Sequence, residues 1–180
     1  MAEPGYKYLK TYQLATVIYD LTVEFCGQFL SGRDFVRLRE QMIQAGRSNK
    51  QNIAEGHLEK SLKSYIKLLG VAIASLEELL EDYRDFLRQR KLEMWDLNHP
   101  KIREFREFRV LWDFQKSPNS PNTPSLPKNS QEAANLILTL GHQQSFLLDR
   151  LIKSLEEKFV KEGGYSEKLL RNRLEYRNKT

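Results

Sequence analysis

Residues 62–87 decide the fold, and they read LKSYIKLLGVAIASLEELLEDYRDFL. Apolar side chains recur in this stretch at alternating intervals of four and three residues: Leu62, Ile66, Leu69, Ile73, Leu76, Leu80, Tyr83 and Leu87. Such heptad spacing places the apolar side chains on one side of a helix, where partner helices pack at a shallow crossing angle. The stretch therefore predicts a long helix at about residues 61–91 within a helical bundle.

Other stretches with helical spacing of apolar residues lie on both sides of this one. They predict long helices at about residues 7–30, 34–56 and 130–162, and a short helix at about 99–113 with Pro100 at its first position. The apolar row of the last long helix is interrupted once, by Gln144. We therefore expect an all-α fold, an up-and-down four-helix bundle with one extra short helix.

Two segments outside the bundle helices are set apart by their composition. Four of the six prolines lie between residues 118 and 127, so residues 114–129 are expected to form a proline-rich connector. Gly163-Gly164 is expected to end the last bundle helix, which gives a bundle domain at 1–163 and a basic tail at 164–180. The tail carries five Lys or Arg residues against two Glu, and its leucines favour a short helix.

The composition of the 180 residues limits the classes of protein to consider. The formal net charge is +5, which is compatible with nucleic-acid binding, and the single cysteine, Cys26, excludes an internal disulfide. The N-terminal residues have neither the basic nor the apolar segment of a signal peptide, and no stretch is apolar for long enough to span a membrane. These features favour a cytoplasmic protein without a membrane partner.

Histidine and cysteine offer little for catalysis or metal binding. The three histidines are His57, His99 and His142, and none is paired with another His or with Cys at the spacing of metal ligands. Cys26 falls within the apolar face of the first helix and has no visible base beside it, so we interpret it as a small buried side chain.

An acidic cluster on the third helix is the best candidate for enzyme chemistry. Its members are Glu77, Glu78, Glu81, Asp82 and Asp85. Glu78 and Glu81 share a helix face, a spacing that holds Mg²⁺ in all-helical nucleotide pyrophosphohydrolases, but such a site needs a second, facing carboxylate pair. We therefore interpret the cluster as a solvated helix face that pairs with Arg84 and Arg88. We expect no enzyme, no metal site and no cofactor.

Basic and aromatic residues of the tail are the main candidates for binding nucleic acid: Lys168, Arg171, Arg173, Tyr176, Arg177 and Lys179. Arginine contacts phosphate through two N–H groups and stacks on bases, and tyrosine can also stack. Arg47 and Lys50 on the second helix are candidates for the same role. A second interpretation stays open, in which a solubilising tail folds back on the bundle and is anchored by Leu169, Leu170 and Leu174.

Residues 41–56, which read QMIQAGRSNKQNIAEG, resemble a bacterial four-helix bundle family first noticed as proteins encoded in intervening sequences of 23S rRNA genes. The family's hallmark, Asn-Ile-Ala-Glu-Gly, is matched by Asn52, Ile53, Ala54, Glu55 and Gly56. Ser75 to Leu79 match a further stretch, and the chain from Leu147 to its end resembles the "suffix" subgroup of the family. Where many members carry Ile-Pro-Ser, this chain has Ser48-Asn49-Lys50-Gln51.

The hallmark residues predict structural roles. Asn52 is placed to bond backbone groups near the end of the second helix, and Gly56 is expected to cap that end. Glu55 is expected to pair with a neighbouring cation.

The resemblance implies a helical bundle that assembles into a homo-oligomer, often a ring-like pentamer. A relative, the accessory protein of diversity-generating retroelements, forms a basic barrel that binds nucleic acid and a reverse transcriptase. The predicted function is thus that of a non-catalytic protein that binds RNA or DNA, or assists a reverse transcriptase, as an oligomeric scaffold. A protein-binding scaffold without a nucleic-acid role and a metal-dependent nucleotide hydrolase are the alternatives.

Overall fold

A computed structural model describes residues 3–107 and 125–179, and every regular element among them is helical. Two short 3₁₀ turns, η1 (Gly5–Tyr8) and η2 (Arg33–Phe35), precede the first two long helices. The α-helices are α1 (Lys10–Phe29), α2 (Val36–Leu58), α3 (Leu62–Gln89), α4 (Pro100–Glu107), α6 (Ser130–Glu162) and α7 (Tyr165–Lys179). The predicted all-α class is confirmed.

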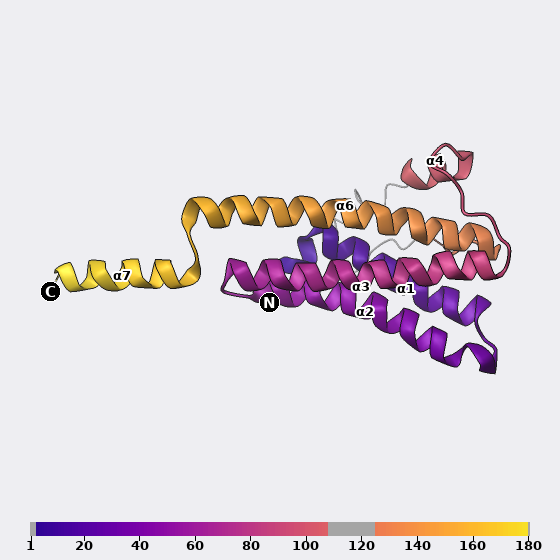
Figure 1. Cartoon of the computed structure of the whole chain (residues 1–180), viewed down its shortest axis with the longest axis horizontal. Helices are drawn as coiled ribbons and strands as arrows, with labels where there is room; N and C mark the ends of the chain where they lie inside the picture. The colour runs from indigo at the N-terminus through magenta and orange to yellow at the C-terminus, as the bar shows by residue number, and fades with distance from the viewer. Residues whose placement is uncertain (1–2, 108–124, 180) are drawn as a thin grey trace.

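Helices α1, α2, α3 and α6 lie side by side and alternate in direction along the chain (Figure 1). Each of the four contacts two of the others, so that they enclose a common core, and we call them the bundle. Helix α4 lies against α6, whereas α7 continues beyond the end of the bundle (Figure 1). Within the described ranges, no helix has an apolar stretch long enough to cross a membrane.

Several predicted helix ends are shifted. The first helix begins at Lys10 and not near residue 7, because Gly5–Tyr8 form the separate turn η1 and Leu9 is extended. The second continues past Gly56 to Leu58. The short helix begins at Pro100, as predicted, but its expected end at 108–113 and the connector at 114–124 lie outside the described residues. In the remainder of the predicted connector, Leu126 is buried against the core.

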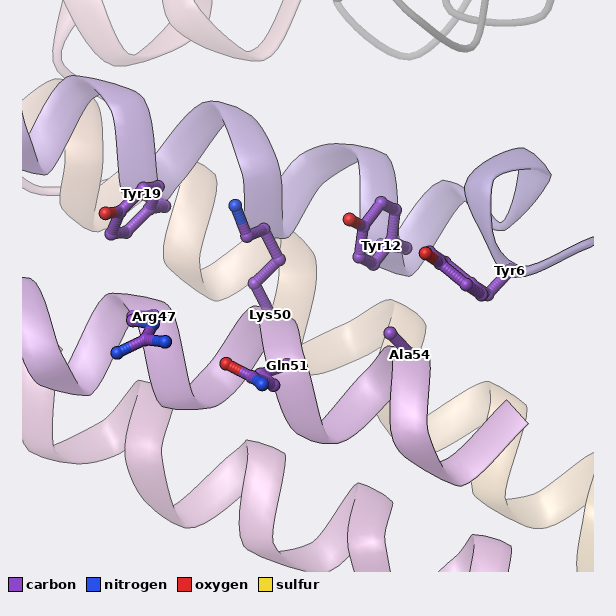
Figure 2. Close-up of a pocket in the computed structure, with 7 residues that line it drawn as sticks. All are labelled: Tyr6, Tyr12, Tyr19, Arg47, Lys50, Gln51 and Ala54. Carbon is purple, nitrogen blue, oxygen red and sulfur yellow. The ribbon is translucent and has the colours of Figure 1, made fainter. Parts of the chain in front are cut away.

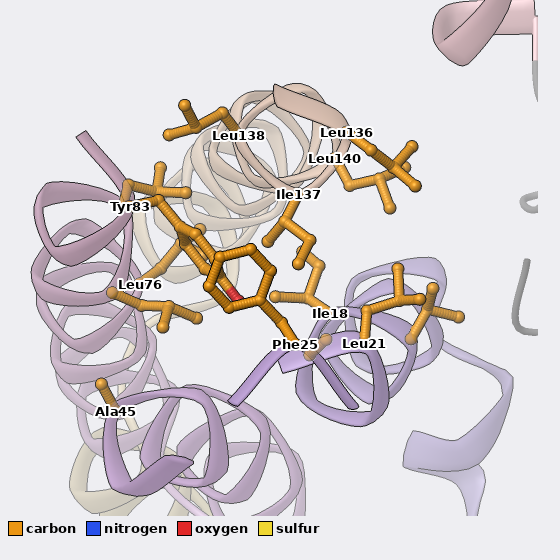
Figure 3. Close-up of a cluster of buried hydrophobic side chains, with 14 of the residues drawn as sticks. Ile18, Leu21, Phe25, Ala45, Leu76, Tyr83, Leu136, Ile137, Leu138 and Leu140 are labelled. Atoms are coloured by element: carbon orange, nitrogen blue, oxygen red, sulfur yellow. The ribbon is translucent and has the colours of Figure 1, made fainter. Parts of the chain in front are cut away.

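An aromatic cluster of the core joins the C-terminal parts of α1 and α3. Phe25 is fully buried and lies beside Tyr83 (Figure 3), with 4.9 Å between the two ring centroids. Its ring centroid is 4.8 Å from that of Phe86. Both contacts are edge-to-face, the arrangement that aromatic quadrupoles favour. The hydroxyl of Tyr83 donates to Thr22 Oγ1 at 3.1 Å, so its polar end is satisfied inside the core.

Helix α3 buries a wider face than its heptad row predicts. Leu69, Leu76 and Leu87 are buried as expected, but Leu79 and Phe86, outside that row, are buried as well. The reason is that α3 packs against both α2 and α6, and two partners require two adjacent rows of side chains.

The N-terminal half of α6 also buries more of its surface than its apolar row predicts. Residues 133–141 are all buried, although one apolar row was predicted. Helices α1 and α3 cover one side of this half, and α4 with the loop before it covers another. Asn135 bonds that loop: its Oδ1 accepts from Trp95 N at 2.8 Å, and its Nδ2 donates to the carbonyl oxygen of Glu93 at 3.1 Å. At the far end Phe159, which continues the helical spacing of Leu151 and Leu155 and was therefore expected in the apolar row, is 36% exposed.

A buried amide pair joins three helices of the bundle. Gln144 Nε2 of α6 donates to Asn49 Oδ1 of α2 at 2.7 Å, and Asn49 Nδ2 donates to the carbonyl oxygen of Ala72 in α3 at 2.8 Å. Both side chains are essentially inaccessible to water. Gln144, the polar residue that interrupts the apolar row of α6, therefore donates a hydrogen bond to another helix.

Gly56 does not cap α2, contrary to the sequence prediction, because the helix continues to Leu58 and Glu59 is its C-cap residue. A Cβ atom at Gly56 would lie 2.7 Å from Cδ2 of Tyr65 and 3.3 Å from Cβ of Leu68. The glycine is thus required by the close approach of α2 and α3, not by a left-handed turn.

Replacing Gly56 by alanine is expected to lower the free energy of unfolding by about 1–2 kcal/mol, since the clash outweighs the gain in helix propensity. Gly70→Ala is the matched control: a Cβ at Gly70 meets no atom within 4 Å, so this change should stabilise by about 0.5–1 kcal/mol. Urea unfolding of both variants provides the comparison. Equal stability of the two would contradict the packing role of Gly56.

Candidate nucleic-acid interface

A groove between α1 and α2 combines tyrosines with cations. It is lined by Tyr6, Tyr12, Tyr19, Arg47, Lys50, Gln51 and Ala54, and its volume is about 300 Å³. Figure 2 shows the tyrosines along η1 and α1 on one wall, and Arg47, Gln51 and Ala54 along α2 on the other. The structure thus brings the predicted residues Arg47 and Lys50 together with three aromatic rings.

The side chains of the groove are held by contacts among themselves. Lys50 Nζ lies 4.4 Å from the centroid of the Tyr19 ring, a cation–π contact, and the rings of Tyr6 and Tyr12 meet edge to face at 4.8 Å. Asp20 is the nearby acid: partial burial raises the pKa of its carboxyl, and the charge of Lys50 opposes that rise.

Of residues 52–56, the segment that matches the family's hallmark, only Ala54 lines this groove. Ile53 is fully buried in the core, which turns the neighbouring Ala54 to the groove. Asn52 Nδ2 donates to the carbonyl oxygen of Ser48 at 2.8 Å. The side chain thus bonds a backbone group, as predicted, but within the helix and not at its end. Glu55 is exposed, and no ion pair of Glu55 is seen among the described residues.

The predicted tail residues lie on α7, away from the groove (Figure 1). Lys168, Arg171, Arg173 and Arg177 are exposed, and Tyr176 is 72% exposed. The side chain of Lys179 lies outside the described part of the chain. Arg173 and Arg177 are four residues apart and share a helix face, so two cations face the same direction.

The direction of α7 is set by the glycine pair before it. Gly163 has φ 79°, a conformation that favours glycine, and it ends α6 as predicted. The Gly164 amide donates to Glu167 Oε2 at 3.0 Å, and Arg171 Nη2 donates to the Glu162 carbonyl oxygen at 3.3 Å. The tail does not fold back on the bundle, and Leu169, Leu170 and Leu174 are each about half exposed.

Sequence reasoning missed the three tyrosines of the groove. In the sequence, Tyr12 and Tyr19 belong to a second row of apolar residues beside the row of Leu14, Ile18 and Leu21, and two adjacent rows predict a wide buried face. Both tyrosines are only half-buried, because their outer edges border the groove. The available signal was the interval of seven residues, which places both rings on one side of α1.

The acidic cluster of α3 forms the ion pairs that were predicted for it. Arg84 Nη1 lies 2.6 Å from Glu81 Oε1, and Arg88 Nη2 lies 2.8 Å from Asp85 Oδ1. Among the residues that the structure describes, no three His, Cys, Asp or Glu side chains are grouped to hold a metal ion.

Asp82 is the unusual member of that cluster. Burial, with further contributions from Glu78 and Asp85, raises the pKa of its carboxyl from 3.8 to about 6, and its Oδ2 is buried without a hydrogen-bond partner in the described structure. Between these two values the folded chain keeps a proton that the unfolded chain has lost. The contribution of Asp82 to stability therefore falls as the pH rises through this window.

Asp82→Asn is accordingly expected to raise the free energy of unfolding at about pH 7.5 and to have little effect at about pH 4. Asp85→Asn, at an exposed position paired with Arg88, should give no such gain. Urea unfolding at both pH values measures the difference. An equal effect of Asp82→Asn at both would exclude titration as its cause.

The surroundings of the three histidines and of Cys26 favour structural roles for these residues. His57 contacts the Tyr65 ring, with centroids 5.9 Å apart, and His99 stacks on Trp95 at 4.1 Å. Burial, followed by the charge of Arg84, lowers the pKa of His142. Cys26 is buried as predicted, and burial raises the pKa of its thiol to about 11, so the reactive thiolate is disfavoured.

Comparison of the chain with protein-family models, with curated proteins and with solved structures finds no match.

Proposed function

We propose that this protein is a non-catalytic nucleic-acid-binding protein that acts as an oligomeric helical scaffold. The observation that carries the proposal is the set of exposed cations on α7, namely Lys168, Arg171, Arg173 and Arg177, with Arg47 and Lys50 as a second basic group. Phosphate contacts by Lys and Arg supply most of the affinity of sequence-independent binding. The resemblance of residues 41–56 to the intervening-sequence family adds the expectation of a homo-oligomer, a pentamer as in many members of that family, and of a reverse transcriptase as partner.

The tail is expected to contribute to binding through its charge. Replacing Lys168, Arg173 and Arg177 together by glutamine should weaken binding of RNA and DNA at least about tenfold at low salt, since three phosphate contacts are lost. Arg171 is left unchanged because it also bonds the end of α6. A gel-shift titration measures the effect.

The matched control changes three exposed arginines near the opposite end of the bundle to glutamine: Arg33, Arg37 and Arg103. It removes the same total charge but should leave most of the affinity. If both triple variants bind equally, net charge and not the tail is responsible. If the wild-type protein binds neither RNA nor DNA at low salt, the proposed function fails.

A protein-binding scaffold without a nucleic-acid role is the second candidate. It is favoured by exposed apolar side chains at the end of α6 and on α7, with Val160 83% and Leu170 58% exposed. Contiguous apolar side chains at a surface are typical of interaction sites. Purification of the protein with a partner protein, but without nucleic acid by absorbance ratio, would support this candidate.

A further inference from the structure

We propose that the groove between α1 and α2 binds single-stranded nucleic acid, with bases against its tyrosine rings and phosphates against Arg47 and Lys50. This inference rests on the proposed function and specifies a second contact site, distinct from α7, and the form of nucleic acid that it accepts.

The arrangement of the groove matches the repeating chemistry of a strand. Figure 2 shows the Lys50 amino group between the rings of Tyr19 and Tyr12, with the Tyr6 ring next in line. Tyr12 and Tyr19 are two helical turns apart, about 10 Å along α1. Aromatic rings on either side of a cation offer stacking and phosphate contacts side by side, the combination by which proteins hold the bases and backbone of single strands.

The cations of the groove form no ion pair. No carboxylate of the described chain lies within ion-pair distance of Arg47 or Lys50, although Asp20 is near enough to Lys50 to feel its charge, whereas Arg84 and Arg88 are paired on α3. Arg47 is exposed, and Lys50 is half-buried over Tyr19. Both lie on α2 three residues apart, so their charges point to the same side of the helix.

A duplex does not fit this chemistry. Its bases are stacked inside the helix, so only phosphates and groove edges reach a protein surface, and tyrosine rings gain no stacking contact. The groove, at about 300 Å³, has room for a few groups of a strand and not for a double helix. The tyrosines should therefore contribute to single-strand binding alone.

The test compares a labelled single-stranded oligonucleotide with the matching duplex by fluorescence anisotropy. Tyr12→Leu with Tyr19→Leu keeps apolar volume but removes both rings, and should weaken single-strand binding at least about fivefold while duplex binding stays within about twofold. Tyr8→Leu is the control, since Tyr8 is 53% exposed on η1 and does not line the groove.

A second pair of variants changes only exposed residues, so that the core is not disturbed. Gln51→Glu adds a negative charge to the groove at an exposed position and should lower single-strand affinity several-fold. Gln28→Glu adds the same charge to the exposed face of α1 opposite Tyr19 and should not.

The outcomes separate the two proposals. Single-strand binding that is unchanged in both groove variants, while the α7 triple variant binds weakly, would overturn the groove inference and leave the proposed function standing. A duplex affinity that falls together with the single-strand affinity would also overturn it. Absence of binding by the wild-type protein to either form would contradict both.

Discussion

Replacing Phe25 by alanine is expected to remove about 3–5 kcal/mol from the free energy of unfolding, the largest effect of any single change proposed. The side chain is fully buried and contacts the rings of Tyr83, Phe86 and Phe29. Its loss leaves a cavity between α1 and α3 that the surrounding rings fill only in part. Because the whole stability of a domain is about 5–15 kcal/mol, such a loss is a large fraction of the total.

Urea unfolding followed by circular dichroism measures this loss. Phe146→Ala is the matched control, since the same residue type on α6 is 60% exposed and its loss should cost less than about 1 kcal/mol. Similar costs for Phe25→Ala and Phe146→Ala would contradict the core described for α1 and α3.

Replacing Asn49 by leucine is expected to cost about 2–4 kcal/mol, because the buried amide of Gln144 then loses its partner. Gln144 Oε1 already lacks a hydrogen-bond partner among the described residues. The double variant Asn49→Leu, Gln144→Leu removes both polar groups and should recover at least half of the loss. A double-mutant cycle in urea provides the coupling energy. Costs that simply add would contradict a bonded pair.

These two predictions also indicate which features of the fold can be predicted from the sequence. The heptad of residues 62–87 predicts α3 and the all-α class, since periodicity depends only on local spacing. The role of Gln144 was not predictable, because its partner Asn49 is 95 residues away and the pairing depends on how α2 and α6 meet. Periodicity reports an interruption in an apolar row but not the group that satisfies it.

For the candidate binding residues too, local features could be predicted from the sequence, whereas contacts between helices could not. Their charge and their helices follow from the sequence, so Arg47, Lys50 and the cations of α7 could be named in advance. That Arg47 and Lys50 face Tyr12 and Tyr19 depends on the pairing of α1 with α2, which no local pattern specifies. The direction of α7 likewise depends on the conformation of Gly163 and on the bond from Gly164 to Glu167.

The proposed nucleic-acid binding is tested most directly by the salt dependence of the affinity for an RNA or DNA oligonucleotide. The wild-type protein should bind at low salt, and the logarithm of its association constant should fall linearly with the logarithm of salt concentration, with a slope of about −0.7 to −0.9 per phosphate contact. Undetectable binding at low salt, or an affinity that does not change with salt, would contradict binding through the cations of α7 and the groove.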